Sequence, residues 1–497
     1  MKRYAGVLLP VTSLPSKYGI GCFDQAAYDF VDWLQKAGQR YWQILPLGAT
    51  SYGSSDDSPY QAYSAFAGNP YLISLDALVE EGVLTREECD GVSFGDNPAK
   101  VDFDKLHEHR FALLRKAYER SGISANPDYQ NFIRDNGWWL NDYALFMALK
   151  TFFHDQPFRA WPEDIRMHWG FALEHYNREL YFDIEFQKYM QFKFNQQWSR
   201  LKAYANGKHI QIVGDIPIYV SPDGADVWAH PELFQLDAHN APTAIAGCPP
   251  DAFAEDGQAW GNPLYNWNFH RATDYAWWVS RMWYSFKLYD VVRIDHFRGF
   301  DTYWAIPAGE TTARNGRWRK GPGMELFRAI EKALGPIPLI AEDLGVQTDE
   351  VRELLSASGF PGMRVLIFGF TPDYDNEHLP HNYLPNSIVY TSTHDSQTVC
   401  EQIMDICSEP EKQFAYRYLR TSHAEAMGWS AIKCVWASSA NIAMTTLQDL
   451  LSLGADSRMN TPATIGGKNW RWRVRAEALN PTVSSMLGEI TKTYMRG

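Results

Sequence analysis

The stretch DVVRID, residues 290–295, is a short run of β-branched residues that ends in an aspartate. Runs that are apolar at nearly every position are typical of strands buried on both faces, as the strands of parallel sheets are. Six similar runs end in polar or Gly/Pro-containing turns: GVLLPV (6–11), YWQILPL (41–47), HIQIVGDIPIYV (209–220), IPLIAEDLG (337–345), MRVLIFGF (363–370) and SIVYTSTHD (387–395). Together they predict seven strands of one parallel sheet.

Segments with helical apolar spacing alternate with these runs. They are AAYDFVDWLQKAG (26–38), EFQKYMQFKFNQQWSRLKAYANG (185–207), MELFRAIEKALG (324–335) and DEVRELLSASG (349–359). Strands that alternate with helices predict a parallel α/β sheet, and an eighth strand near IAMTTLQDLLSLG (442–454) would close it into a (β/α)8 TIM barrel. We therefore expect a single catalytic barrel over residues 1–497.

Two gaps between the predicted strands are too long for simple crossover connections. The first, about 48–208, is mostly helical in pattern and separates strands 2 and 3; the second, about 221–289, is rich in Pro, Gly and Trp and separates strands 3 and 4. We expect a helical insertion and a loop-rich, irregular insertion, both building walls over the C-terminal face of the barrel.

The composition narrows the classes of partner. Lys and Arg number 46 against 59 Asp and Glu, a net charge of −13, so neither nucleic acid nor an anionic membrane is an expected partner. The six cysteines include no CxxC pair, and the start, MKRYAGVLLPV, resembles a signal peptide only weakly, so a cytoplasmic location is expected. Aromatic residues make up 15% of the chain, which suits a cleft for a hydroxyl-rich ligand such as a sugar.

Three of the predicted strands end in acids: Asp295, Glu342 and Asp395. A closed barrel would bring these strand ends to one face, where active sites of such barrels lie. Two carboxyl groups that face one bond are what retaining glycoside chemistry requires, one as nucleophile and one as acid and base, while a third can hold sugar hydroxyls. A single strand-end acid is more often a helix cap or a member of an ion pair, but three in one ring favour a catalytic site.

Neighbouring residues should shift the pKa values of these acids. Arg293 shares a strand face with Asp295 and would favour its ionised form. Glu342 follows an apolar run and adjoins Asp343, and both features would raise its pKa. Metal binding is the rival use of clustered acids, but the sequence contains no HExxH or similar ligand pair and no dinucleotide or phosphate loop, so neither a metal nor another cofactor is expected.

The motifs RIDHFRG (293–299), AEDLG (341–345) and TSTHD (391–395) resemble the strand-end signatures of 4-α-glucanotransferases, the amylomaltases or disproportionating enzymes of the α-amylase clan. The resemblance covers nearly the whole chain, with further matching segments: SLPSKYGIG (13–21), DSPYQAYSAFAGNPYLISL (57–75), GDIPIYV (214–220), GCPPDAFAEDGQAWGNPLYNW (247–267) and RMNTPAT (458–464). It implies a barrel without a C-terminal β-sandwich domain, and no metal.

The resemblance implies a role for each acid. Asp295 matches a nucleophile that forms a covalent glycosyl-enzyme, Glu342 the general acid/base, and Asp395 the stabiliser of the transition state. The implied activity is retaining transfer of α-1,4-glucan segments from a maltooligosaccharide or amylose to the 4-hydroxyl of a glucan or glucose.

It also implies a set of substrate-binding residues. Tyr60 would pack on the donor sugar, and one loop would fold over bound glucan while a second lies near the acceptor. The implied residues are Arg293 and His394 around the cleaved sugar, Asp215 at the barrel mouth, Asp251, Gln258 and Trp260 in the first loop, and Asn460 in the second; His296 is expected at the pocket edge.

The chain departs from the family pattern by about three extra residues within 52–60 and by Lys468 and Ala463, which should change loop shape rather than chemistry. Two alternatives remain open at this point: an α-1,4-glucan hydrolase of the same clan, and a catalytically inactive glucan-binding protein. Walls and aromatic residues that screen the intermediate from water favour transfer.

Overall fold

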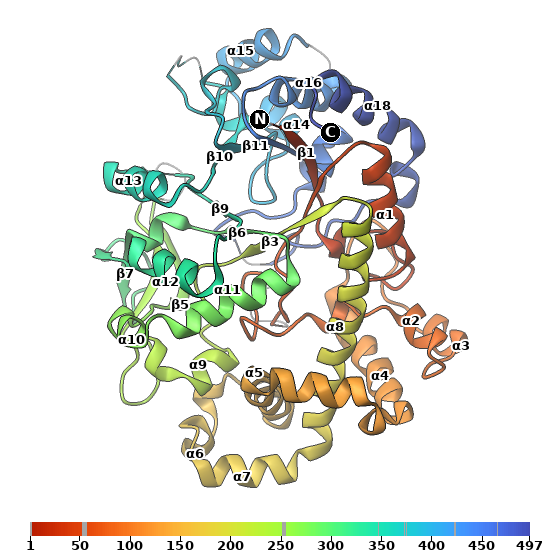
Figure 1. Cartoon of the computed structure of the whole chain (residues 1–497), viewed down its shortest axis with the longest axis vertical. Coiled ribbons are helices and arrows are strands. Elements are labelled where there is room, and N and C mark those ends of the chain that lie inside the picture. Colours follow the sequence, from red (N-terminus) through yellow and green to blue (C-terminus); the bar gives the residue numbers. More distant parts are fainter. Residues whose placement is uncertain are drawn as a thin grey trace.

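The computed structural model describes residues 2–51, 57–250, 255–345, 347–371, 373, 375–421, 424–464 and 466–497 (Figure 1). Eight parallel strands form a closed barrel in chain order, with β1 paired to both β2 and β12. The strands are β1 (Tyr4–Leu8), β2 (Tyr41–Gln43), β3 (Gln211–Ile216), β6 (Val291–Ile294), β9 (Leu339–Ala341), β10 (Gly362–Val365), β11 (Ser387–Tyr390) and β12 (Ile442–Thr446). The predicted barrel and the predicted eighth strand are confirmed.

Helices surround the barrel, and the first three named here lie where amphipathic spacing predicts them. They are α1 (Gln25–Lys36), α12 (Met324–Leu334), α13 (Asp349–Ser358), α14 (Val399–Glu401), α15 (Glu409–Leu419), α16 (Ala424–Trp436), α17 (Leu447–Leu450) and α18 (Pro481–Thr493). The first of them begins at an N-cap, Asp24, whose carboxylate accepts a hydrogen bond from the backbone N–H of Ala26 at 3.1 Å. The last, α18, packs against α1 and brings the two ends of the chain together beside the barrel (Figure 1).

The segment between β2 and β3 is helical. It contains α2 (Leu75–Glu80), α3 (Arg86–Asp90), α4 (Phe103–Ser121), α5 (Pro127–Phe152), α6 (Glu163–Arg166), α7 (Gly170–Glu179) and α8 (Tyr181–Gly207). The long helices α5 and α8 pack against each other, and α8 returns to the barrel while α6 and α7 lie at the far end of the molecule (Figure 1). Among the described residues, no helix combines the length and the apolar character that crossing a membrane requires.

A second sheet lies outside the barrel. It is antiparallel, in the order β5-β4-β7-β8, and consists of β4 (Ala244–Cys248), β5 (Gln258–Pro263), β7 (Thr302–Pro307) and β8 (Arg317–Lys320). The segment between β3 and β6 thus contains two strands, besides α9 (Ala225–Ala229), α10 (Trp267–Ala272) and α11 (Ala276–Leu288), where the sequence predicts loops. The pattern misses this sheet because β8 is exposed at every position and because β4 pairs with β7, which follows a different barrel strand.

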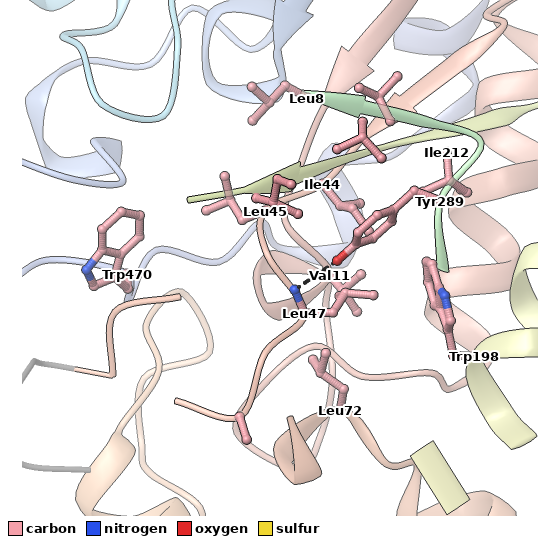
Figure 2. Close-up of a cluster of buried hydrophobic side chains, with 14 of the residues drawn as sticks. Leu8, Val11, Ile44, Leu45, Leu47, Leu72, Trp198, Ile212, Tyr289 and Trp470 are labelled. Carbon is pink, nitrogen blue, oxygen red and sulfur yellow. Dashed lines mark hydrogen bonds between the residues drawn. The ribbon is translucent and has the colours of Figure 1, made fainter. Parts of the chain in front are cut away.

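An apolar cluster lies at the ends of β1 and β2 and includes Leu45 and Leu47, which follow β2 (Figure 2). Leu8, Ile44 and Ile212 are buried together with Trp198 of α8. The ring of Tyr289, which follows α11, reaches into this cluster, and its hydroxyl accepts a hydrogen bond from the backbone N–H of Leu47 at 3.3 Å. The packing therefore joins the helical segment to the barrel at the edge of the acid-bearing face.

Candidate active site

The three strand-end acids lie at the C-terminal end of the barrel. Asp295 follows β6 directly, Glu342 follows β9 directly, and Asp395 lies in the loop after β11. The side chains of Asp295 and Asp395 are 29% and 36% exposed, so each keeps an opening to solvent. The charge of Asp295 acts on the ionisation of Glu342, and that of Asp395 on Asp295, so the structure brings all three into one electrostatic group.

Asp295 is held by its own strand and by an arginine. Its backbone N–H donates to the carbonyl of Ile216 in β3 at 3.0 Å, and Nη2 of Arg293 lies 3.1 Å from its Oδ1. Burial raises the pKa of Asp295 to about 6, although Arg293 acts in the opposite direction, as its position on the strand predicts. The carboxyl group is therefore mainly ionised at pH 7.

Glu342 is fixed by two backbone donors. Its Oε2 accepts from the N–H of His296 at 2.7 Å and its Oε1 from that of Leu344 at 2.9 Å. Burial, followed by the charge of Asp295, raises its pKa to about 8, so the group keeps its proton at pH 7. The sequence predicts that Asp343 also raises the pKa of Glu342, and this prediction is wrong. The carboxylate of Asp343 instead accepts from the N–H of Met363 at 2.6 Å and pairs with Arg364 at 2.9 Å.

Asp395 differs from Asp295 and Glu342 in that its pKa is lowered. Burial disfavours its charge, but His394 and Asn460 outweigh that effect and hold the pKa of Asp395 well below its usual range. His394 Nε2 lies 3.0 Å from Oδ2, and the amide of Asn460 donates to Oδ1 at 2.7 Å. The loop that contains Asn460 is thus bonded directly to an acid of the barrel, a contact that its sequence position does not predict.

A buried network joins β3, β6 and the loop after β11. Asp215 is fully buried, and its Oδ2 accepts from Nη1 of Arg293 at 2.6 Å and from the hydroxyl of Tyr60 at 2.8 Å. The same hydroxyl lies 2.6 Å from Nε2 of His394, whose ring is stacked on the tyrosine at 5.7 Å. Asp215 therefore lies behind the exposed acids, where it orients Arg293 and Tyr60 and has no exposed surface of its own.

The strand β5 contributes the edge of the site. His296 has a left-handed backbone (φ 52°), which aims its N–H at Glu342, and its ring contacts that of Trp260 edge to face at 4.9 Å. Burial and then the nearby Arg298 lower the pKa of His296 to about 3, so its ring is neutral. Trp260 Nε1 donates to Oε1 of Gln258 at 3.1 Å. Asp251 lies outside the described residues, as do 52–56 of the extra loop.

A cavity of about 50 Å³ adjoins Asp215 and Tyr60. Its other walls include Tyr219, Arg281 and Tyr289, and none of the three strand-end acids lines it. The cavity is too small for a sugar ring, since ligand pockets typically measure about 300–1,000 Å³. The cavity therefore lies beside Asp215 and Tyr60 and is not the site of the three acids.

Two further residues contact the loop of Asp395, and sequence reasoning missed them as site residues. Arg458 donates from Nε to the carbonyl of Asn460 at 2.7 Å and pairs with Glu401 at 3.5 Å. Asp449 is a buried acid. The signal that could have identified it is its position inside the apolar run LQDLLSLG (447–454). Among the described residues, no group of three or more His, Cys, Asp or Glu side chains is arranged to hold a metal ion.

The chain is similar to known proteins in both sequence and structure. Residues 9–479 match the family model described as 4-alpha-glucanotransferase. The chain is 47% identical over 497 residues to a 4-alpha-glucanotransferase of Streptococcus pneumoniae, covering 100% of this chain and 98% of the relative, and 45% identical to one of Clostridium butyricum, covering 98% and 99%. The solved amylomaltase from Streptococcus agalactiae in complex with acarbose is similar with a TM-score of 0.96 and 42% identity, covering 100% of both chains.

Proposed function

The chain belongs to the 4-alpha-glucanotransferase family, and from that premise we propose the residues by which it transfers α-1,4-glucan segments between maltooligosaccharides, amylose and glucose. The observation that carries the proposal is that the neighbouring strands β6 and β9 end in two acids with different surroundings, Asp295 beside Arg293 and Glu342 held by two backbone N–H groups. Asp295, at about 6, is ionised at neutral pH, and Glu342, at about 8, is protonated. A retaining mechanism needs one carboxylate and one carboxylic acid at the same bond.

In the first half of the reaction, an oxygen of Asp295 attacks the anomeric carbon of the donor. The bond from that carbon to the leaving O4 breaks while Glu342 gives its proton to O4, so the shortened glucan departs with a free 4-hydroxyl. The donor segment is left covalently bound to Asp295, and Glu342 is left as a carboxylate.

In the second half, Glu342 takes the proton of the 4-hydroxyl of an acceptor glucan. The acceptor oxygen attacks the anomeric carbon, the bond to Asp295 breaks, and the protonation states of both acids are restored. Two inversions at one carbon retain the α configuration.

Asp395 stabilises the transition state as a permanent carboxylate. Its low pKa, maintained by His394 and Asn460, keeps it charged while positive charge develops on the sugar ring, and its partly exposed oxygens can accept hydrogen bonds from ring hydroxyls. Arg293 and His394 orient the acids around the cleaved sugar, and Asp215 and Tyr60 hold Arg293 and His394 in place.

Trp260, Gln258 and His296 form the aromatic and polar edge against which we place the bound glucan. The ring pair of Trp260 and His296 presents an apolar face beside Glu342, and apolar faces suit the C–H surfaces of glucose rings. We assign Asp251 to the loop over the glucan and Asn460 to the acceptor side on the family resemblance.

The product pattern from maltotriose tests the activity. Transfer yields a ladder of longer oligosaccharides together with glucose, with nearly constant reducing ends. A steady rise of reducing ends without longer products would instead identify a hydrolase, and binding without either product would identify an inactive glucan-binding protein.

Substitution of the nucleophile tests the assignment of Asp295. Asp295→Asn should lower the transfer rate by orders of magnitude, while the matched control Asp349→Asn, at a side chain that is 91% exposed, should leave it unchanged. An Asp295→Asn variant with undiminished transfer would show that another residue is the nucleophile.

We also propose a cytoplasmic location, supported by six dispersed cysteines that a reducing compartment keeps as thiols.

A further inference from the structure

Asp449 is a buried acid in the short helix α17, directly after the last barrel strand. Only 1% of the residue is exposed. Its Oδ2 accepts hydrogen bonds from the hydroxyls of Thr391, at 2.6 Å, and Ser392, at 2.5 Å, and its Oδ1 accepts from the N–H of Val399 at 2.7 Å. Thr391 and Ser392 begin the loop after β11, and Val399 begins α14, so one carboxylate binds both ends of the segment 391–399.

This segment carries His394 and Asp395. Among the described contacts, Asp449 bonds to neither of them, so any effect on them passes through the ends of the loop. The start of the loop is tied further to β12, because the hydroxyl of Thr391 lies 3.1 Å from that of Thr445. The end of the loop is bonded to the α17 segment through the carboxylate of Asp449.

The carboxylate of Asp449 is bonded mainly to the loop and less to its own helix. The N-terminus of α17 is capped by Thr446, whose hydroxyl accepts from the N–H of Asp449 at 3.1 Å, and this cap needs no side chain at position 449. The carboxylate makes three hydrogen bonds to segment 391–399, and it also interacts with the hydroxyl of Thr446, the N-cap of α17. Burial raises the pKa of Asp449, which means that the protein keeps an acid where its charge is disfavoured.

We propose that Asp449 is a positioning residue that holds the loop 391–399 so that His394 and Asp395 meet the reacting sugar. The inference rests on the proposed role of Asp395 in glucan transfer. A loop fixed at both ends limits the displacement of Asp395, and a displacement of about 1 Å can lower a catalytic rate by about 100-fold. Other residues that we assign to the donor, Tyr60, Gln258 and Trp260, lie outside this loop.

Two substitutions at one position test the proposal. Asp449→Asn keeps one oxygen for Val399 and places N–H groups toward hydroxyls that can turn to accept them, so kcat for maltotriose transfer should fall by about 3- to 10-fold, close to the loss of one hydrogen bond. Asp449→Ala removes all three bonds, and kcat should fall by about 100-fold. The KM should change less than about threefold in both variants, because the substitution disturbs transition-state contacts more than donor binding.

The matched control is Asp456→Asn. Asp456 lies seven residues further along the same segment and is exposed, so its kinetics should equal those of the wild type. Circular dichroism and thermal unfolding of each variant show whether the fold survives; if Asp449→Ala does not fold, Asp449→Asn alone decides. An unchanged kcat in a folded Asp449 variant, or a change in KM alone, overturns the proposal.

A double-mutant cycle with Asp395→Asn separates positioning from a general structural effect. The residual rate is measured with α-maltosyl fluoride, whose leaving group needs no proton. If Asp449 acts through Asp395, the loss caused by Asp449→Asn should largely disappear in the Asp395→Asn background. Equal losses in both backgrounds overturn the proposal. The Asp295→Asn variant is assayed in parallel. If it transfers glucan as fast as the wild type, the proposed function itself is contradicted. If it is inactive while the Asp449 variants are unaffected, only the positioning role is contradicted.

Discussion

The guanidinium of Arg293 is shared by two carboxylates, with Nη1 2.6 Å from Oδ2 of Asp215 and Nη2 3.1 Å from Oδ1 of Asp295. Register explains the first contact, because Asp215 and Arg293 are paired residues of the neighbouring strands β3 and β6. The fully buried Asp215 fixes one side of the guanidinium, so the other side faces the partly exposed Asp295. One cation thereby orients the proposed nucleophile and limits the rise of its pKa.

Arg293→Lys should therefore lower kcat by about 100- to 1,000-fold. A lysine ammonium lacks the planar fork that reaches two carboxylates at once, so either Asp215 or Asp295 loses its partner. Initial rates of transfer from maltotriose measure the effect, and Arg319→Lys in the exposed strand β8 is the control. An Arg293→Lys variant within twofold of the wild type would show that the shared guanidinium has no catalytic role.

The pH profile of kcat/KM should be bell-shaped. Asp295 must be ionised, so activity rises as the pH passes about 6, and Glu342 must be protonated, so activity falls as the pH passes about 8. The two limbs belong to the interacting pair as a whole. With α-maltosyl fluoride as donor, whose leaving group needs no proton, the wild type should lose the alkaline limb of the first half-reaction; its persistence would assign that limb to another residue.

Glu342→Gln should raise the melting temperature at pH 8. The pKa of Glu342 in the folded protein, about 8, lies above its ordinary value of 4.5. The stability that the protonated side chain provides is therefore fully present below about pH 4.5 and is lost as the pH rises through about 8. A glutamine cannot ionise and avoids that loss. Differential scanning calorimetry should show a gain of about 1–3 °C at pH 8 and a smaller one at pH 4.5; a gain that is larger at pH 4.5 would contradict the raised pKa.

The barrel could be predicted from the sequence because each of its strands is a local signal. A run such as VVRI is buried on both faces, and the acid that follows it falls at the strand end by the geometry of the fold, which is how Asp295 and Glu342 could be placed on one face before the structure was known. The antiparallel sheet had no such signal, because its partners β4 and β7 are far apart in sequence and the exposed β8 carries no apolar pattern.

Side-chain partners were less predictable than strand ends. Asp343 adjoins Glu342 in sequence but turns to Arg364, because successive residues of an extended chain point to opposite sides. Asn460 reaches Asp395 across 65 residues, and no periodicity encodes that contact. These are the contacts that depend on how loops close, and loop closure is set by the whole fold.

Tyr60 offers a test that separates its hydroxyl from its ring. The hydroxyl bonds to Asp215 and lies 2.6 Å from His394, so Tyr60→Phe should lower kcat by about 10-fold, as expected for losing a hydrogen bond to a charged group, while KM stays nearly constant. Tyr60→Ala also removes the ring that would pack on the donor sugar, so KM should rise as well. Tyr63→Phe is the control, because the Tyr63 hydroxyl forms no hydrogen bond with any described side chain. If Tyr60→Phe raised KM and left kcat unchanged, the hydroxyl would act on the sugar directly and not through Asp215 and His394.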